Sequence, residues 1–169
     1  EMKKAVGHAW LTYQHAKYGV LARALPKLLR EAQAADTALA NTVSSAPAAH
    51  LLGEVYQIAS SALRKLGEHE LAWLAGDRGI AVAQRADDPL LAATATYRVA
   101  LSLMSMGRAR PALEVNVNIA NRLASGGESG EATEPERLSV YGALLLQGSM
   151  AAARIGDMAT VRDLLAGAE

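Results

Sequence analysis

The chain has 169 residues, and its 17 basic and 17 acidic side chains cancel, so it offers no basic surface of the kind that binds nucleic acid or anionic membranes. It contains no cysteine, which excludes disulfides and thiol chemistry. No apolar run reaches the roughly 18 residues of a membrane span, so we expect no membrane partner and a cytoplasmic protein.

Alanine is the commonest residue, phenylalanine is absent, and aromatic residues make up only 4% of the chain. A core of Ala and Leu suits closely packed helices better than sheets, which favour Val, Ile, Tyr and Phe. The chain begins with Glu1 inside a helical pattern. We therefore expect an all-α domain cut from a longer protein.

The first helix is predicted over 5–18, with Gly19 ending it, and a second helix follows to about residue 40. Pro26 lies inside this second helix and should kink it or mark a late start. The connector over 41–47 is polar, and its Ser45 could cap the third helix.

The clearest helical hairpin runs over 50–89. Apolar residues recur three or four positions apart on both sides of Gly67. Gly67 should end the first of the two helices, because glycine adopts the left-handed cap conformation without steric cost. The second helix carries small residues, including Gly76 and Gly79, that let two helix backbones approach closely. Asp88 and Pro89 then supply a helix cap and a first helical residue.

Two further helices are predicted over 90–106 and 109–124, separated by Gly107. A segment over 125–133 looks flexible. Thr133 and Glu136 have the spacing of a capping box before a helix that runs to residue 155. Gly156 then leads into a short last helix over 158–166.

Four turn glycines align these hairpins: Gly19, Gly67, Gly107 and Gly156. A large residue precedes each glycine and a small one follows five positions later. Successive glycines are 40 to 49 residues apart. Periods of this length in a helical sequence are typical of stacked helical repeats. We predict one domain over 1–169, made of hairpins at about 5–40, 46–86, 88–124 and 134–168.

The segment KLGEHELAWLAGDRGIAVAQRADDP resembles the turn and second helix of a tetratricopeptide (TPR) unit. Together with MGRARPALEV and LSVYGALLLQGSMAAARIGD, it is similar to the C-terminal TPR-like region of actinobacterial transcriptional regulators that carry an N-terminal helix-turn-helix domain of the XRE type. The resemblance implies an α-solenoid of about four TPR-like antiparallel helix pairs, about eight helices. It also implies a regulatory role, with DNA read by an N-terminal domain that this chain lacks.

Each first helix of a hairpin holds one tyrosine: Tyr13, Tyr56, Tyr97 and Tyr141. In a TPR stack these helices line the concave surface, where a column of tyrosines would contact a peptide, a small molecule or a partner protein. The alternative is that the tyrosines pack between repeats and only their hydroxyls reach solvent.

Ser60, Arg64 and Arg98 would share this face. The two guanidinium groups could bind a ligand carboxylate, because their planar geometry matches it. We favour the commoner role for such arginines, which is ion pairing between helices with Glu54, Glu68 or Asp77.

Other candidates for chemistry are weak. Asn116, Asn118 and Asn121 could hold a peptide backbone, but they lie on a second helix. The four histidines lack metal-ligand spacing, and the GGESGE segment lacks the residues of a phosphate-binding loop. We expect no metal, no cofactor and no enzymatic activity.

The leading hypothesis is therefore a non-catalytic, ligand-binding regulatory domain of a transcriptional regulator. The alternative is a homodimerisation module without a small ligand. Its interface would lie at the ends of the array, which carry these apolar residues: Trp10, Met158, Val161, Leu164 and Leu165.

Overall fold

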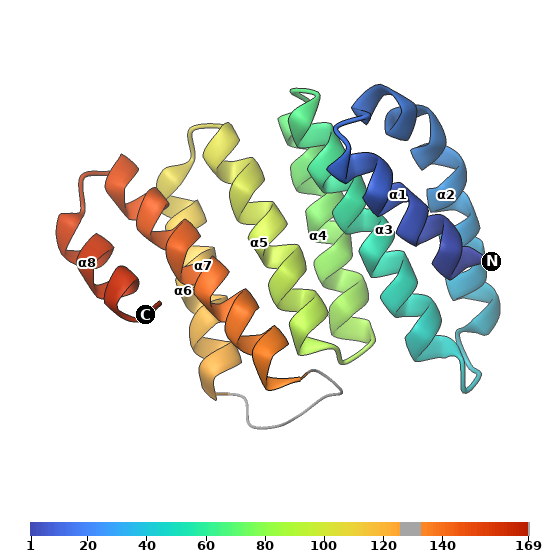
Figure 1. Ribbon diagram of the computed structural model, residues 1–169. Helices are drawn as coiled ribbons and strands as arrows, with labels where there is room; N and C mark the ends of the chain where they lie inside the picture. Colours follow the sequence, from blue (N-terminus) through green and yellow to red (C-terminus); the bar gives the residue numbers. More distant parts are fainter. Residues whose placement is uncertain (126–132, 169) are drawn as a thin grey trace.

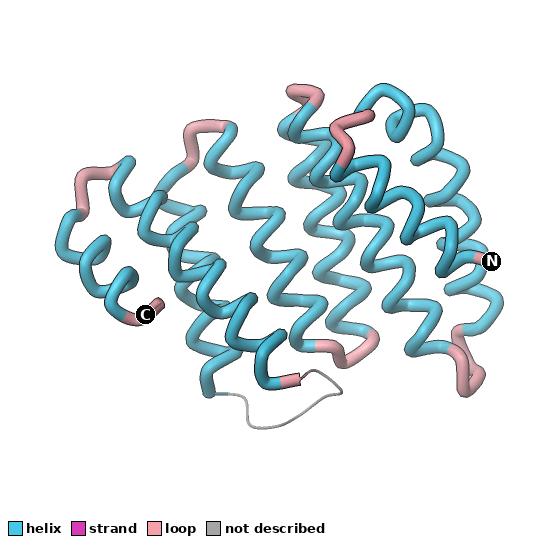
Figure 2. Tube along the Cα trace, in the orientation of Figure 1, coloured by secondary structure: helices cyan, strands magenta, loops and turns pink. Residues whose placement is uncertain are grey.

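The computed structural model describes residues 1–125 and 133–168, and within them all regular structure is helical (Figures 1 and 2). The expected flexible segment lies outside these residues, apart from its two ends. The helices, in chain order, are α1 (Met2–Gln14), α2 (Tyr18–Leu39), α3 (Ser45–Lys65), α4 (His69–Arg85), α5 (Pro89–Ser105), α6 (Ala109–Ser125), α7 (Glu134–Arg154) and α8 (Met158–Ala166).

The helices form four antiparallel pairs that stack in chain order, so the predicted all-α solenoid is confirmed (Figure 1). The helices α2, α4 and α6 each pack against both of their chain neighbours, α8 packs against α7, and the odd-numbered helices contact one another from α1 to α7. In the described part of the chain, the even-numbered helices make no backbone contact with each other. The array therefore curves toward α1, α3, α5 and α7, whose open side we call the inner face.

Five helix ends share one turn, in which a residue with positive φ follows the helix: Ala16, Gly67, Asp87, Gly107 and Gly156. In the turn after α3, the Gly67 N–H donates to the Arg64 carbonyl, and the Glu68 N–H donates to the Leu63 carbonyl. These two bonds define the Schellman motif, which satisfies carbonyls that the helix end would leave unpaired. Three of the four predicted turn glycines are confirmed.

Gly19 is the exception, and the prediction that it ends the first helix is wrong. It lies inside α2, and the first turn is centred on Ala16, with φ 57°. A non-glycine residue holds the left-handed conformation there, which hides the turn from a search for glycine. The five-residue spacing then leads from Ala16 to Leu21, which is 1% exposed, instead of to the exposed Ala24.

Helix starts follow local capping chemistry. Asp88 accepts a hydrogen bond from the Leu91 N–H at 2.8 Å, and Pro89 is the first residue of α5, as predicted. The Thr133 N–H donates to Glu136 at 2.9 Å, which confirms that side of the capping box. The expected cap at Ser45 is wrong, because Ser45 is already the first residue of α3.

Successive pairs meet at a position that recurs along the chain. The residue nine positions after each turn residue is Leu25, Gly76, Asn116 and Leu165. The residue eight positions before the next turn residue is Ala59, Val99 and Gly148. Leu25 and Ala59 share a buried cluster, a Cβ added to Gly76 would lie 2.8 Å from Val99, and one added to Gly148 would lie 3.7 Å from Asn116. At each crossing, a small residue therefore accommodates a larger one.

The buried apolar residues form three clusters along the array: one among α1 to α4, one between α5, α6 and α7, and one at the other end of the same three helices. Each pair is thus buried mainly by its neighbours, as in other solenoids. No helix among the described residues combines the length and apolar character needed to cross a membrane.

Gly76→Ala should lower the free energy of unfolding by about 1–3 kcal/mol, because the added methyl group would overpack against the β-branched Val99. Gly7→Ala is the control, since a Cβ on this exposed α1 residue meets nothing within 4 Å. The control should gain up to about 1 kcal/mol from helix propensity. Urea unfolding followed by circular dichroism measures both, and equal effects would contradict the close α4–α5 crossing.

Candidate binding site

Aromatic and arginine side chains from three repeats gather near the N-terminal half of the inner face. We call this group the aromatic–arginine cluster, and its members are Trp10, Tyr13, Tyr18, Arg64, Tyr97 and Arg98. Each of these residues is partly exposed. Trp10 and Tyr13 lie on α1, Tyr18 begins α2, Arg64 lies on α3, and Tyr97 and Arg98 lie on α5.

Arg98 is the centre of this cluster. Its guanidinium carbon lies 5.7 Å from the centroid of the Trp10 ring and 5.4 Å from that of Tyr97, within cation–π range. Trp10 stacks edge-on with Tyr13 at 5.9 Å, and Tyr13 lies 5.5 Å from Tyr18. The first and third helix pairs are therefore joined by side chains.

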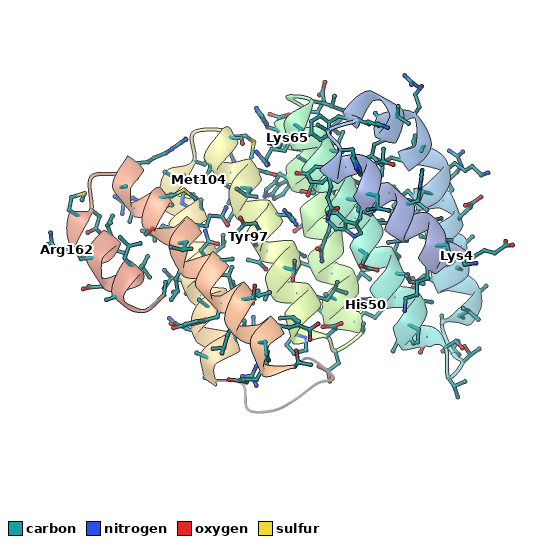
Figure 3. The ribbon with its side chains drawn as sticks, viewed as in Figure 1. Lys4, His50, Lys65, Tyr97, Met104 and Arg162 are labelled. Atoms are coloured by element: carbon teal, nitrogen blue, oxygen red, sulfur yellow. The ribbon has the colours of Figure 1, made fainter. Side chains whose placement is uncertain are left out.

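These side chains meet across α3. Both α1 and α5 contact α3, and within the described residues α1 and α5 do not contact each other. The opposite side of α3 is occupied by α4: Cβ atoms added to Gly76 and Gly79 would lie 3.5 Å from Ser60 Oγ and 3.4 Å from Tyr56 Cβ. The contact between Arg98 and Trp10 therefore passes over the inner face. Figure 3 labels Tyr97, the neighbour of Arg98 in sequence, on α5.

Arg98 has no carboxylate partner among the described residues, and its Nε atom is buried without a hydrogen bond. Burial lowers the pKa of Arg98 from its usual value, the phenols of Tyr13 and Tyr97 act in the opposite direction, and the charge of Arg64 lowers it again. Arg64 also lacks an ion pair within the described residues. The favoured interpretation, pairing with Glu54, Glu68 or Asp77, is therefore wrong.

Two of the predicted site residues lie in the interior instead. Tyr56 is 5% exposed, and its hydroxyl accepts a hydrogen bond from Gln33 Nε2 on α2 at 2.9 Å. Ser60 is 1% exposed and faces α4. The prediction that Tyr56 and Ser60 line the ligand face is wrong, because both occupy the side of α3 that packs against the second layer.

Tyr141 is half-buried on α7 and packs, like Tyr97, against the cluster around Leu144 and Leu145. No aromatic contact links Tyr141 to the aromatic–arginine cluster in the described chain. The predicted column of four tyrosines is thus reduced to Tyr13 and Tyr97, which meet through Arg98. Of the three asparagines on α6, Asn116 is buried against α7, while Asn118 and Asn121 are exposed.

Two depressions lie elsewhere. One, of about 390 Å³, lies where α2, α3 and α4 end or begin, beside an ion pair of 2.6 Å between Arg85 and Asp36. The other, of about 160 Å³, is apolar and lies between α1, α2 and α3 around Met2 and Leu51. Neither includes a predicted site residue. In the described residues, His50 pairs with Asp88 at 2.9 Å, and no cluster of three or more acidic, histidine or cysteine side chains could hold a metal.

Two members of the cluster were not predicted as site residues. Trp10 was assigned to an end surface, and Tyr18 was read only as the large residue before Gly19. Counted from Ala16, Tyr13 is equivalent to Arg64, since each lies three positions before its turn residue. The correct first turn would therefore have placed Tyr13 beside Arg64 on the inner face.

No protein-family model, curated protein sequence or solved structure matches this chain.

Arg98→Met should raise the free energy of unfolding by about 1 kcal/mol, because it removes a partly desolvated charge that has no carboxylate partner among the described residues, and it keeps most of the volume. Arg85→Met is the matched control: it breaks the pair with Asp36, whose side chain is 14% exposed, and should cost about 1 kcal/mol. Urea unfolding distinguishes the two signs. A loss above 1 kcal/mol for Arg98→Met would show that stacking on Trp10 outweighs the desolvation of the charge.

Proposed function

We propose that this chain is a non-catalytic binding domain of a bacterial transcriptional regulator, and that the aromatic–arginine cluster is its binding site for a peptide, small molecule or partner protein. The observation that supports the binding site is the unpaired Arg98, held between Trp10 and Tyr97 on the inner face. Aromatic rings and arginine are the side chains that contribute most to recognition at protein surfaces. The regulator assignment and a cytoplasmic location rest on the resemblance of the sequence.

The position of the cluster suggests how binding would act on an attached domain. A ligand in contact with α1, α3 and α5 would bridge three successive repeats, which otherwise contact only their neighbours. Binding would favour one relative orientation of these repeats. Because α1 is the first helix of the array, that change would reach a DNA-binding domain attached ahead of it.

Fractions of a bacterial extract, added to the purified chain, should raise its melting temperature by about 2–4 °C for each kcal/mol by which the bound ligand stabilises the folded state. The double variant Tyr13→Ala with Tyr97→Ala should lose this shift, because it removes rings beside Arg98. Tyr141→Ala is the control, as a half-buried tyrosine outside the cluster. A shift that survives the double variant would place the binding site elsewhere, and no shift with any fraction would refute a ligand-binding role.

The homodimer remains the second candidate, since apolar residues are exposed where the array ends. Leu146 and Met150 of α7 are 50% and 54% exposed, and Met158 and Leu165 of α8 are 53% and 42% exposed. The internal equivalents of Leu165 are Leu25, Gly76 and Asn116, all buried by the next odd-numbered helix. The last pair therefore exposes a stacking surface, whereas the equivalent surface of each earlier pair is covered by the pair that follows it.

The opposite end of the array is polar. Lys4 and His8 are exposed on α1, at the positions that Val55 and Ala59 hold in α3, where both are buried. Lys4 and Arg162 mark the two ends in Figure 3. Charge at Lys4 opposes head-to-tail stacking of one copy onto the next. The surface on α7 and α8 is therefore better suited to the same surface of a second copy, around a two-fold axis.

Sedimentation equilibrium should give about twice the 17.7 kDa chain mass at micromolar concentration if this dimer forms. Leu146→Glu with Met150→Glu should reduce the mass to that of one chain, because it places charges in the apolar contact. Leu11→Glu is the control at the polar end, since Leu11 is 53% exposed. A wild-type chain that stays monomeric at all concentrations would remove this candidate.

A further inference from the structure

Two arginines contribute to the inner face. The charge of Arg64 lowers the pKa of Arg98, and in the described chain neither side chain has a carboxylate within ion-pair distance. Two ion pairs of other cations lie on other helices: Arg85 contacts Asp36, and Lys27 contacts Glu31. The described residues thus leave two positive charges of the inner face without a carboxylate partner.

We propose that Arg64 and Arg98 bind an oxyanion, carboxylate or phosphate, carried by a ligand whose apolar part lies against Trp10 and Tyr13. This inference rests on the proposed function and specifies the chemistry of the same site.

The geometry around Arg98 favours an anion over a cation. A guanidinium that stacks on aromatic rings keeps its N–H donors in its own plane, where they remain directed at an acceptor. The buried Nε of Arg98 is one such donor without a partner. In addition, Arg98 itself occupies the position that a cationic ligand would take between Trp10 and Tyr97. An added cation would meet two like charges, whereas an oxyanion would be attracted by both.

The apolar side of the ligand follows from the rings that surround the two arginines. Trp10, Tyr13 and Tyr18 form a continuous aromatic contact on the α1 side of Arg98. All three rings are half-buried, so each keeps part of its surface available. A planar or aliphatic group attached to the oxyanion would cover this surface and exclude water, which strengthens the charge interaction.

Trp10 offers a direct readout, because the chain has only two tryptophans. In a Trp73→Phe background, Trp10 is the sole indole fluorophore, and it contacts Arg98. We would titrate phenylacetate, phenyl phosphate and the uncharged phenylacetamide at constant ionic strength. We expect the two anions to change Trp10 emission with dissociation constants on the order of 1 mM and the amide to bind at least tenfold more weakly. The tighter anion then identifies whether a carboxylate or a phosphate is preferred.

Arg64→Met and Arg98→Met, each in the same background, should weaken anion binding at least tenfold. Arg162→Met on α8 should leave it unchanged, which controls for the loss of one positive charge. Melting temperatures near that of the parent would show that the variants fold. Equal binding of the amide and the anions, or anion binding that survives Arg64→Met combined with Arg98→Met, would overturn the proposal.

The extract experiment separates this inference from the proposed function. If an extract fraction stabilises the parent chain and the Arg64→Met, Arg98→Met double variant equally, the binding function stands and the oxyanion site is refuted. If the double variant loses the shift, both are supported.

Discussion

The structure depends on one recurring contact, where the even-numbered helix of one pair crosses the odd-numbered helix of the next. The crossing brings together Gly76 and Val99, then Asn116 and Gly148, while the equivalent residues Leu25 and Ala59 share one buried cluster. Each of these positions combines a small residue with a larger one, and the small residue lies on the even-numbered helix only in the case of Gly76. Close packing contributes dispersion energy when the two side chains together fill the space at the crossing. The sum of their volumes is therefore more constrained than the volume of either side chain alone.

This stacking also explains why the binding site has its position. Once α3 packs its Tyr56 side against α4, only the opposite side is left for groups from α1 and α5 to meet. Burial lowers the pKa of Arg98 there, and no carboxylate among the described residues pairs with it. A partly desolvated charge whose Nε has no hydrogen-bond partner is where a binding function is expected.

The sequence predicts the fold well, because glycine and aspartate mark three of the four hairpin turns and the start of α5. It predicts the site poorly, and the tyrosines show why. Tyr56 lies eleven residues before Gly67, whereas Tyr97 lies ten before Gly107. One residue rotates a helical side chain by about 100°, which separates an interior position from one at the edge of the inner face. Trp10 lies on α1 and Arg98 on α5, with three helices between them in the sequence, so no local pattern reveals their contact.

The equal spacing of the turns and the matched crossings together limit how such a protein can change in length. Gly67, Asp87 and Gly107 close three successive turns at equal spacing, so a copy of residues 68–107 would keep this turn geometry. Such a copy would also keep its crossing, because Gly76 and Val99 lie within the same copied segment. Exchanging single helices between crossings would instead set Val99 opposite Asn116, where two larger side chains would meet and neither partner would be glycine.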